Sequence, residues 1–191
     1  LHRLGVARAE SVVFICDGAR WIWDRLAWIE KRAGLDRSKT VHVLDFCHAA
    51  HHISLALSHL GYSSGVRRKG YVELRKLLHG SRYHEVVRRL TERANQQKLA
   101  EDHEVWTEIR YLERHGSEGH LSYATFRRRG LPSGSCAIES TIRRVINLRL
   151  KSNAIYWLAE NAEGVFALRA LLLCDRWEST LHRLRGAMAR D

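Results

Sequence analysis

The chain has 191 residues, of which 45% are apolar and 28% charged, and this composition fits one folded domain rather than an intrinsically disordered segment. A membrane span is not expected, because the longest stretch free of Asp, Glu, Lys and Arg, residues 46–66, contains four histidines and four serines. The net charge is 32 − 21 = +11, and residues 67–135 carry 15 − 9 = +6 of it, which favours a polyanionic partner such as nucleic acid.

The cysteines favour reduced thiols in a cytoplasmic protein over a disulfide framework or a zinc ribbon, because they are widely spaced and include no Cys-x-x-Cys pair. They are Cys16, Cys47, Cys136 and Cys174. Histidines that follow Cys47 closely make one local group of possible metal ligands: Cys47, His48, His51 and His52. The first two of these point in different directions on a helix, so packing or hydrogen bonding is the simpler interpretation.

Two short apolar runs rich in β-branched residues predict strands at residues 12–16 and 41–44. Helical spacing of apolar residues predicts a helix after each strand, over residues 21–33 and 46–60. This order implies a right-handed crossover between parallel strands. The expected fold class is therefore α/β, with residues 12–16 buried on both faces of a parallel sheet.

The remaining chain has a largely helical pattern, with helices predicted over residues 71–79, 83–98, 101–115, 161–174 and 178–189. A glycine-rich loop at 130–135 precedes one more helix, which should begin at Ser135 or Cys136 and carry an apolar stripe of Ile138, Ile142 and Val145. We divide the chain into a strand–helix–strand–helix part (1–62), an all-helical part (63–130) and a C-terminal helical part (131–191).

Two basic triplets bracket the all-helical part: Arg67, Arg68 and Lys69, and Arg127, Arg128 and Arg129. Each triplet has two interpretations. It can form a solvated helix face, or it can contact the phosphates of a nucleic acid.

Three acids are distinguished by their positions. Asp17 and Asp45 directly follow the predicted strands, and Glu139 lies in the first turns of the helix after the glycine-rich loop. Neighbouring strands lie about 4.8 Å apart, so Asp17 and Asp45 should emerge at the same sheet edge. Carboxylates gathered there suit a pair of Mg²⁺ ions in phosphoryl transfer. In the simpler alternative, Asp17 serves an Asp-Gly turn and Glu139 complements a helix N-terminus.

Several ordered motifs resemble the catalytic region of bacterial insertion-sequence transposases of the ISKra type, relatives of the Mutator-like group. They are residues 16–23 (CDGARWIW), 43–48 (VLDFCH) with His52, and 130–140 (GLPSGSCAIES). The similarity continues through residues 149–151, Trp157, 160–163, 168–173 and Trp177, so it covers nearly the whole chain and is weakest across 63–120.

This resemblance implies an RNase H-like fold whose Asp, Asp, Glu site binds Mg²⁺ or Mn²⁺, cuts DNA and joins its 3′-hydroxyl to a target. By position, Asp17 matches the second catalytic Asp and Glu139 the catalytic Glu, both as metal ligands, while Asp45 and His48 are accessory. The helices of 63–130 match the family's insertion. The implied partners are transposon ends and target DNA, contacted by the two triplets and Arg143, and a second copy of the full-length chain, in the bacterial cytoplasm at the nucleoid.

The sequence departs from the family pattern at two places. The family's Gly-Ser-Gly turn is Gly134-Ser135-Cys136 here, so the backbone freedom of the last glycine is lost. Residues 1–11 contain one acid, Glu10, and no strand pattern that would supply the first catalytic Asp. We therefore expect the C-terminal portion of a longer transposase, which alone binds DNA weakly and catalyses nothing.

Two alternatives belong to other functional classes. The first is a noncatalytic nucleic-acid-binding remnant of a transposase, which would use only its basic helices. The second is a zinc-dependent module built on Cys47 and the neighbouring histidines.

Overall fold

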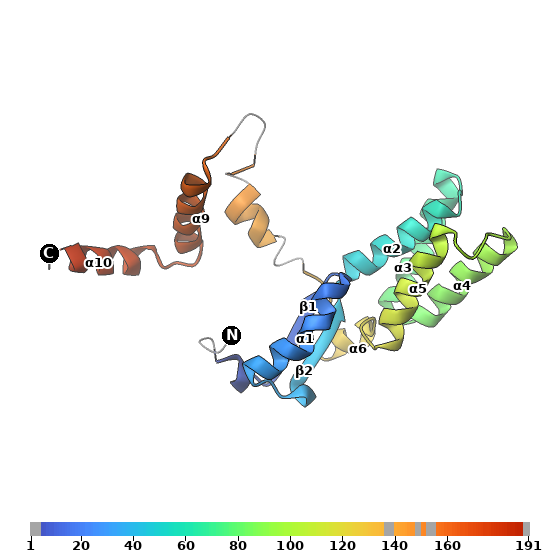
Figure 1. The fold of residues 1–191 in the computed structure, drawn as a ribbon, viewed down its shortest axis with the longest axis horizontal. Helices are drawn as coiled ribbons and strands as arrows, with labels where there is room; N and C mark the ends of the chain where they lie inside the picture. Colours follow the sequence, from blue (N-terminus) through green and yellow to red (C-terminus); the bar gives the residue numbers. More distant parts are fainter. Residues whose placement is uncertain (1–4, 136–139, 148–149, 152–155, 189–191) are drawn as a thin grey trace. The chain divides into compact units, whose positions relative to one another are not determined.

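The structure is a computed structural model that describes residues 5–135, 140–147, 150–151 and 156–188. It divides into two compact units, residues 1–135 and 136–191. The first holds the strands and most of the core, and the second holds the C-terminal helices (Figure 1). No helix among the described residues is both long and apolar enough to cross a bilayer.

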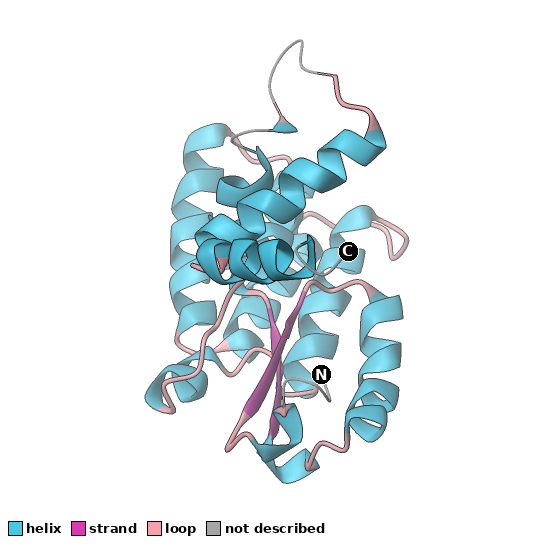
Figure 2. Ribbon diagram, turned by 90° about the vertical axis from the view of Figure 1, so that its left-hand side faces the viewer, coloured by secondary structure: helices cyan, strands magenta, loops and turns pink. Residues whose placement is uncertain are grey.

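The first unit is built on two parallel strands, as the sequence predicts (Figure 2). Strand β1 (Val12–Cys16) pairs with β2 (Thr40–Leu44) in a register that runs from Val12 opposite Thr40 to Cys16 opposite Leu44. The 14-residue helix α1 (Arg20–Ala33) and a 3-10 turn, Arg37–Lys39, connect them. The fold class is α/β and mostly helical.

Within the first unit five helices follow β2, and they pack into one core with it (Figure 1). They are α2 (Phe46–His59), α3 (Ser64–His79), α4 (Tyr83–Gln96), α5 (Glu104–Ser117) and α6 (Tyr123–Arg128). Buried side chains from all five contribute, among them Ile53, Leu74, Leu90, Leu112 and Tyr123. The Tyr123 hydroxyl donates to the Leu44 carbonyl at 2.8 Å, which fixes α6 against the carboxyl end of β2.

The structure corrects three expectations for this unit. The expected burial of residues 12–16 on both faces is wrong, since all five residues of β1 are only half-buried, with β2 as their only strand neighbour in the described part. Helix α3 begins at Ser64 rather than near Tyr71, so the first basic triplet is helical. Helix α6 was not predicted, and it places Arg127 and Arg128 in its last turn.

The second unit contains a π-helical turn, η4 (Arg143–Asn147), and helices α9 (Ala159–Leu173) and α10 (Trp177–Met188). These two helices confirm the predicted pair within two residues at each boundary. Of the expected stripe before them, Val145 is buried, Ile142 is exposed, and Ile138 lies outside the described residues. Arg169 on α9 donates to the Val145 carbonyl at 3.0 Å.

Candidate functional site

The carboxyl edge of the two-stranded sheet places Asp17 next to Asp45. Cys16 is opposite Leu44 in the register, and each aspartate directly follows the last residue of its strand. The Asp45 amide continues the pairing by donating to the Cys16 carbonyl at 2.8 Å. The predicted juxtaposition of the two acids is therefore present in the backbone of the structure.

Asp45 is 2% exposed and has a structural role that the sequence analysis did not predict. One carboxylate oxygen accepts hydrogen bonds from the amides of Cys47 at 2.7 Å and His48 at 3.2 Å, so Asp45 caps α2. The other oxygen accepts from the Ser135 amide at 2.6 Å. Burial alone would raise the pKa of Asp45, but these hydrogen bonds outweigh it and lower the pKa.

A second bond holds the same loop at the sheet edge, because the Phe46 amide donates to the Ser133 carbonyl at 3.0 Å. The end of the glycine-rich loop is thus fixed to the first residues of α2. Glu139, four residues beyond Ser135, lies outside the described residues, and so does Cys136, one of the two expected starts of its helix.

Asp17 is half-buried and forms the turn that the simpler interpretation expects. Its Oδ1 accepts from the Ala19 amide at 3.0 Å, and its carbonyl accepts from the Trp23 indole at 2.7 Å. Within the described part of the chain, Oδ2 of Asp17 has no hydrogen-bond partner. One oxygen therefore holds the turn, and the other is available to a ligand.

His48, expected to be accessory, lies beside Asp45 with Nδ1 3.7 Å from the carboxylate, which is beyond hydrogen-bonding distance. The cysteine–histidine group around it does not assemble. Among the described residues, the ligand atoms of Cys47, His48, His51 and His52 do not converge as a metal site. His52 instead pairs through Nδ1 with the Glu108 carboxylate and stacks on Tyr111 at 3.6 Å between ring centroids.

Sequence reasoning missed the contact between Tyr111 and the turn at Asp17. The Tyr111 hydroxyl packs so closely on Gly18 that a Cβ there would lie 1.6 Å from it. This hydroxyl is buried and has no hydrogen-bond partner among the described residues. Burial raises the pKa of Tyr111, with Asp17 and Glu108 adding to the effect. No sequence pattern relates residues 93 positions apart, so only the fold reveals this contact.

Sequence reasoning also missed a group of two histidines and a glutamate at the end of α5. Nδ1 of His115 lies 3.1 Å from Nδ1 of His120, which in turn lies 3.3 Å from a carboxylate oxygen of Glu118. Trp23 stacks on His120 with ring centroids 4.1 Å apart. Burial lowers the pKa of His115 to about 3 and that of His120 to about 4, and Arg114 contributes to both shifts. Both imidazoles are therefore neutral at pH 7.

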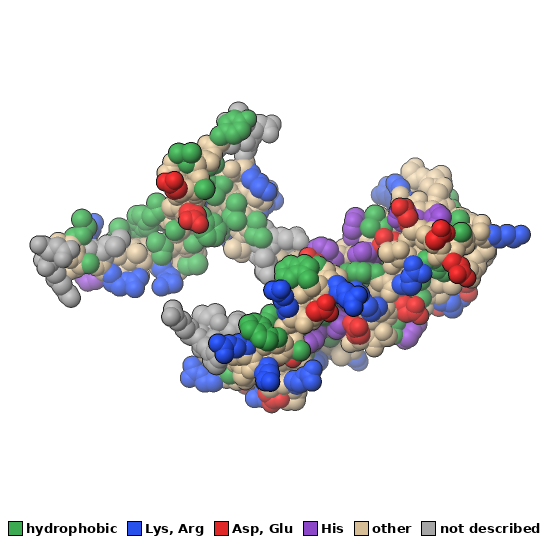
Figure 3. All heavy atoms as spheres, viewed as in Figure 1, with side chains coloured by type: hydrophobic (Ala, Val, Ile, Leu, Met, Phe, Trp, Pro, Cys, Tyr) green, Lys and Arg blue, Asp and Glu red, His purple; other side chains and the backbone are tan. Residues whose placement is uncertain are grey.

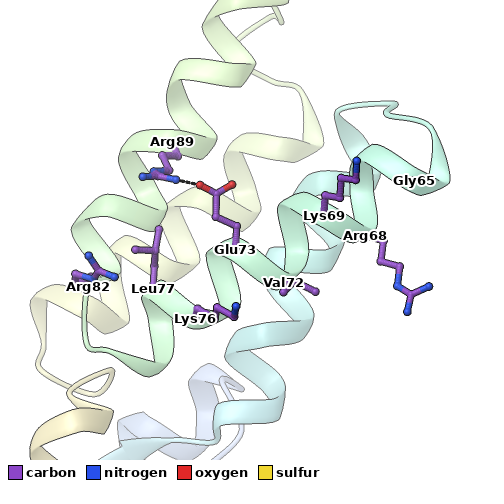
Figure 4. Close-up of a pocket in the computed structure, with 9 residues that line it drawn as sticks. All are labelled: Gly65, Arg68, Lys69, Val72, Glu73, Lys76, Leu77, Arg82 and Arg89. Carbon is purple, nitrogen blue, oxygen red and sulfur yellow. Dashed lines mark ion pairs between the residues drawn. The ribbon is translucent and has the colours of Figure 1, made fainter.

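The first basic triplet contributes to a groove of about 770 Å³ between α3 and α4 (Figure 4). Its lining includes four basic side chains without an ion-pair partner in the described part of the chain: Arg68, Lys69, Lys76 and Arg82. Glu73 is the acid of the lining, and it is paired with Arg89, as Figure 4 shows. Elsewhere on this unit, acidic and basic side chains are interspersed on the visible face (Figure 3).

The other expected DNA-contacting residues lie in different environments. Arg67 donates to the Ser58 hydroxyl at 3.2 Å, on α2. The side chain of Arg128 donates to Thr125, while Arg129 caps α6. Arg143 is exposed on η4, in the second unit.

Arg127 shares a surface with the C-terminal end of α3. Partial desolvation, together with the charges of Arg127 and Arg75, lowers the pKa of His79. Arg75 lies over the Phe46 ring at 5.0 Å from its centroid, and the His79 ring meets that of Phe46 at 5.5 Å. This basic surface therefore reaches the residue directly after Asp45.

Comparisons of the chain with models of protein families, with curated proteins and with solved structures find no match.

Proposed function

We propose that the chain is the C-terminal portion of the catalytic domain of a DNA transposase, with an RNase H-like fold and an acidic site for Mg²⁺ or Mn²⁺. The observation that carries this proposal is the hydrogen bond from the Ser135 amide to Asp45, beside Asp17. It attaches Ser135, the last described residue before Glu139 in the sequence, to the edge where the strands end.

In this site Asp17 offers one carboxylate oxygen to the metal while the other holds the Asp-Gly turn. Asp45 acts as a positioning residue, because both of its oxygens are already engaged by backbone amides. Divalent ions held by Asp17 and Glu139 would align the attacking oxygen and stabilise the leaving oxygen of a phosphodiester. The half-buried β1 would receive further strands of the sheet along its edge opposite β2.

The basic residues would bind the substrate. On α3, Arg68, Arg75, Lys76 and His79 recur at helical spacing and share one face with Val72. That face extends from the groove toward Phe46 and the sheet edge. A DNA backbone lying on it would approach the acids that are proposed to hold the metal.

The test measures the binding of Mn²⁺ to the unmodified chain by calorimetry. Asp17→Asn and Glu139→Gln should each weaken one shared site, so the double variant should lose little more than either single variant. Asp102→Asn is the matched control, because Asp102 is an exposed acid in the turn before α5, and it should leave Mn²⁺ affinity unchanged. If Asp17→Asn and Glu139→Gln reduced Mn²⁺ affinity independently of each other, or did not reduce it, the proposal of a shared metal site would be wrong.

A noncatalytic nucleic-acid-binding protein is the second candidate, and the groove on α3 and α4 favours it. It predicts DNA binding that weakens steeply with salt and does not respond to Mg²⁺ or Mn²⁺. If Mn²⁺ increased the DNA affinity of the parent chain but not that of Asp17→Asn, the result would support the transposase and contradict the noncatalytic alternative.

A further inference from the structure

The end of helix α5 has a geometry that forces two histidines together. Gly119 has a φ of +82°, its amide donates to the Gly116 carbonyl at 3.0 Å, and the His120 amide donates to the His115 carbonyl at 3.0 Å. These two bonds form the Schellman motif, which brings the side chains at the two ends of the outer bond into contact. That contact usually joins apolar residues. Here it joins His115 and His120, with Glu118 between them in sequence.

No placement of the ring protons gives every nitrogen and oxygen of this group a favourable hydrogen-bond partner. Arg114 lies 3.0 Å from Nε2 of His115, and because an arginine can only donate, the proton of this neutral ring must be on Nδ1. Nδ1 of His115 then donates to Nδ1 of His120, which leaves the Glu118 oxygen facing a second acceptor at 3.3 Å. Reversing the His115–His120 bond would leave the one proton on Nδ1 of His120 shared between His115 and Glu118, and it would place an N–H of His115 against Arg114. Each arrangement leaves one unfavourable contact.

From these separations we propose that His115, Glu118 and His120 form a site for Zn²⁺ or a similar transition-metal ion. A tetrahedral zinc ion bound at about 2.0–2.1 Å holds its ligand atoms about 3.3 Å apart. The observed 3.1 and 3.3 Å match this value, and all three ligand atoms lie within 4.8 Å of one another. A cation accepts all three lone pairs and removes the conflict between acceptors.

Supporting contacts hold the ligands in place. The His120 carbonyl accepts from the Leu44 amide at 3.2 Å, so the loop is attached to β2. The indole of Trp23, fixed by its bond to the Asp17 carbonyl, covers the His120 ring. A cavity of about 290 Å³ borders His115 and Glu118, and it leaves room for water or another small ligand at the fourth position of the ion.

Arg114 should oppose metal binding. Its bond to Nε2 of His115 selects the ring form in which Nδ1 carries the proton, and its charge repels a cation. Because Arg114 is exposed, its side chain can move away when the ion binds. Replacing it with an uncharged residue should therefore strengthen binding.

The test is a calorimetric titration of the metal-stripped chain with ZnCl₂, supported by the visible absorption of bound Co²⁺. We expect one ion per chain, no competition from excess Mg²⁺, and a loss of at least about tenfold in affinity for Glu118→Gln, whose side chain is half exposed. His120→Gln should show a similar loss, and Arg114→Met should bind more tightly. Absence of a one-to-one site, or unchanged affinity in Glu118→Gln, would overturn the proposal.

Two control variants locate the ion. The double variant Cys47→Ser with His51→Gln alters exposed ligands outside the site, and it should bind zinc as the parent does. Zinc binding lost in this variant would place the ion on the other histidine group and overturn the assignment. Asp17→Asn keeps the backbone carbonyl that holds Trp23, so it should also leave zinc binding unchanged, and the zinc site and the proposed transposase centre can fail separately.

Discussion

The carboxylate of Asp45 accepts a 2.6 Å hydrogen bond from the amide of Ser135, ninety residues further along the chain. The same side chain caps α2, so one buried acid connects the start of a core helix to the end of the glycine-rich loop. The position of that loop at the sheet edge therefore depends on this carboxylate together with the bond from the Phe46 amide to the Ser133 carbonyl.

Replacing this carboxylate should destabilise the first unit. Asp45→Ala removes the cap and leaves the Ser135 amide without its partner, which should lower the free energy of unfolding by about 2 kcal/mol. Urea denaturation followed by circular dichroism measures the loss. Asp36→Ala is the matched control, because Asp36 caps the short turn before β2 in an exposed position, and it should cost clearly less. Equal losses would contradict the role given to Asp45.

Gly18 should not tolerate even a methyl group. In Gly18→Ala the new Cβ would lie 1.6 Å from the Tyr111 hydroxyl and 2.2 Å from the ring carbon that bears it, so either the turn or α5 must move. We expect a fall in melting temperature of several degrees, equivalent to about 1–3 kcal/mol. Tyr111→Phe should not rescue this variant, because the ring remains, whereas Tyr111→Leu should restore part of the loss.

Gly65→Ala is the control for this substitution. Gly65 lies in α3, and a Cβ added there would have nothing within 4 Å of it, so alanine should be neutral or slightly stabilising. If Gly18→Ala melts at the same temperature as Gly65→Ala, the close approach of Tyr111 is contradicted.

The histidine pair makes the metal-free chain sensitive to acid. The folded state lowers the pKa of His120 to about 4 and that of His115 to about 3, whereas an unfolded histidine titrates near 6.5. Between these values the unfolded chain binds more protons, so stability is fully present above about pH 6.5 and falls as the pH decreases. His120 alone should cost about 2 kcal/mol at pH 5 relative to pH 7.5.

Denaturation with urea at pH 7.5, 6 and 5 measures this dependence. His120→Gln removes one of the two titrating groups and should flatten the decline. A variant that loses stability with pH as steeply as the parent would show that the decline has another origin.

The basic side chains of the groove between α3 and α4 should dominate DNA affinity. Lys76→Ala and Arg82→Ala each remove an unpaired cation from the groove, so each should weaken binding and reduce the slope of log affinity against log salt by about 0.7–0.9 if it contacts a phosphate. Arg88→Ala changes the net charge equally, but Arg88 is paired with Glu85 and Glu92. Its effect should be smaller, and fluorescence anisotropy over a salt series distinguishes the three variants.

Residue patterns alone are sufficient for the two strands and the helix that follows each of them. The apolar run at 12–16 and the stripes after each strand predict β1, α1, β2 and α2 almost to the residue, because burial imposes those periods. The predicted start of α3 is wrong because a glycine in a sequence usually indicates a break. Gly70 instead lies buried within α3, where a Cβ would meet Leu57 and Arg93, so its small size serves close helix packing.

The candidate sites are predictable only in part. The sequence analysis assigns Asp45 only an accessory role and misses its helix cap, although an aspartate directly before a helical stripe is a signal for one. Its bond to Ser135 has no such signal, because nothing near either residue specifies the partner. The pairing of His115 with His120 is equally hidden, because a separation of five residues is not a helical spacing and becomes a contact only through the turn at Gly119.

Successive amides at the end of β2 face opposite neighbours: Leu44 donates to His120, and Asp45 donates to Cys16. Their deuterium exchange rates therefore report two different openings. Exchange at Leu44 requires the 116–120 turn to detach, and exchange at Asp45 requires the strands to separate. A ligand that rigidifies the turn would slow the first rate and leave the second nearly unaltered.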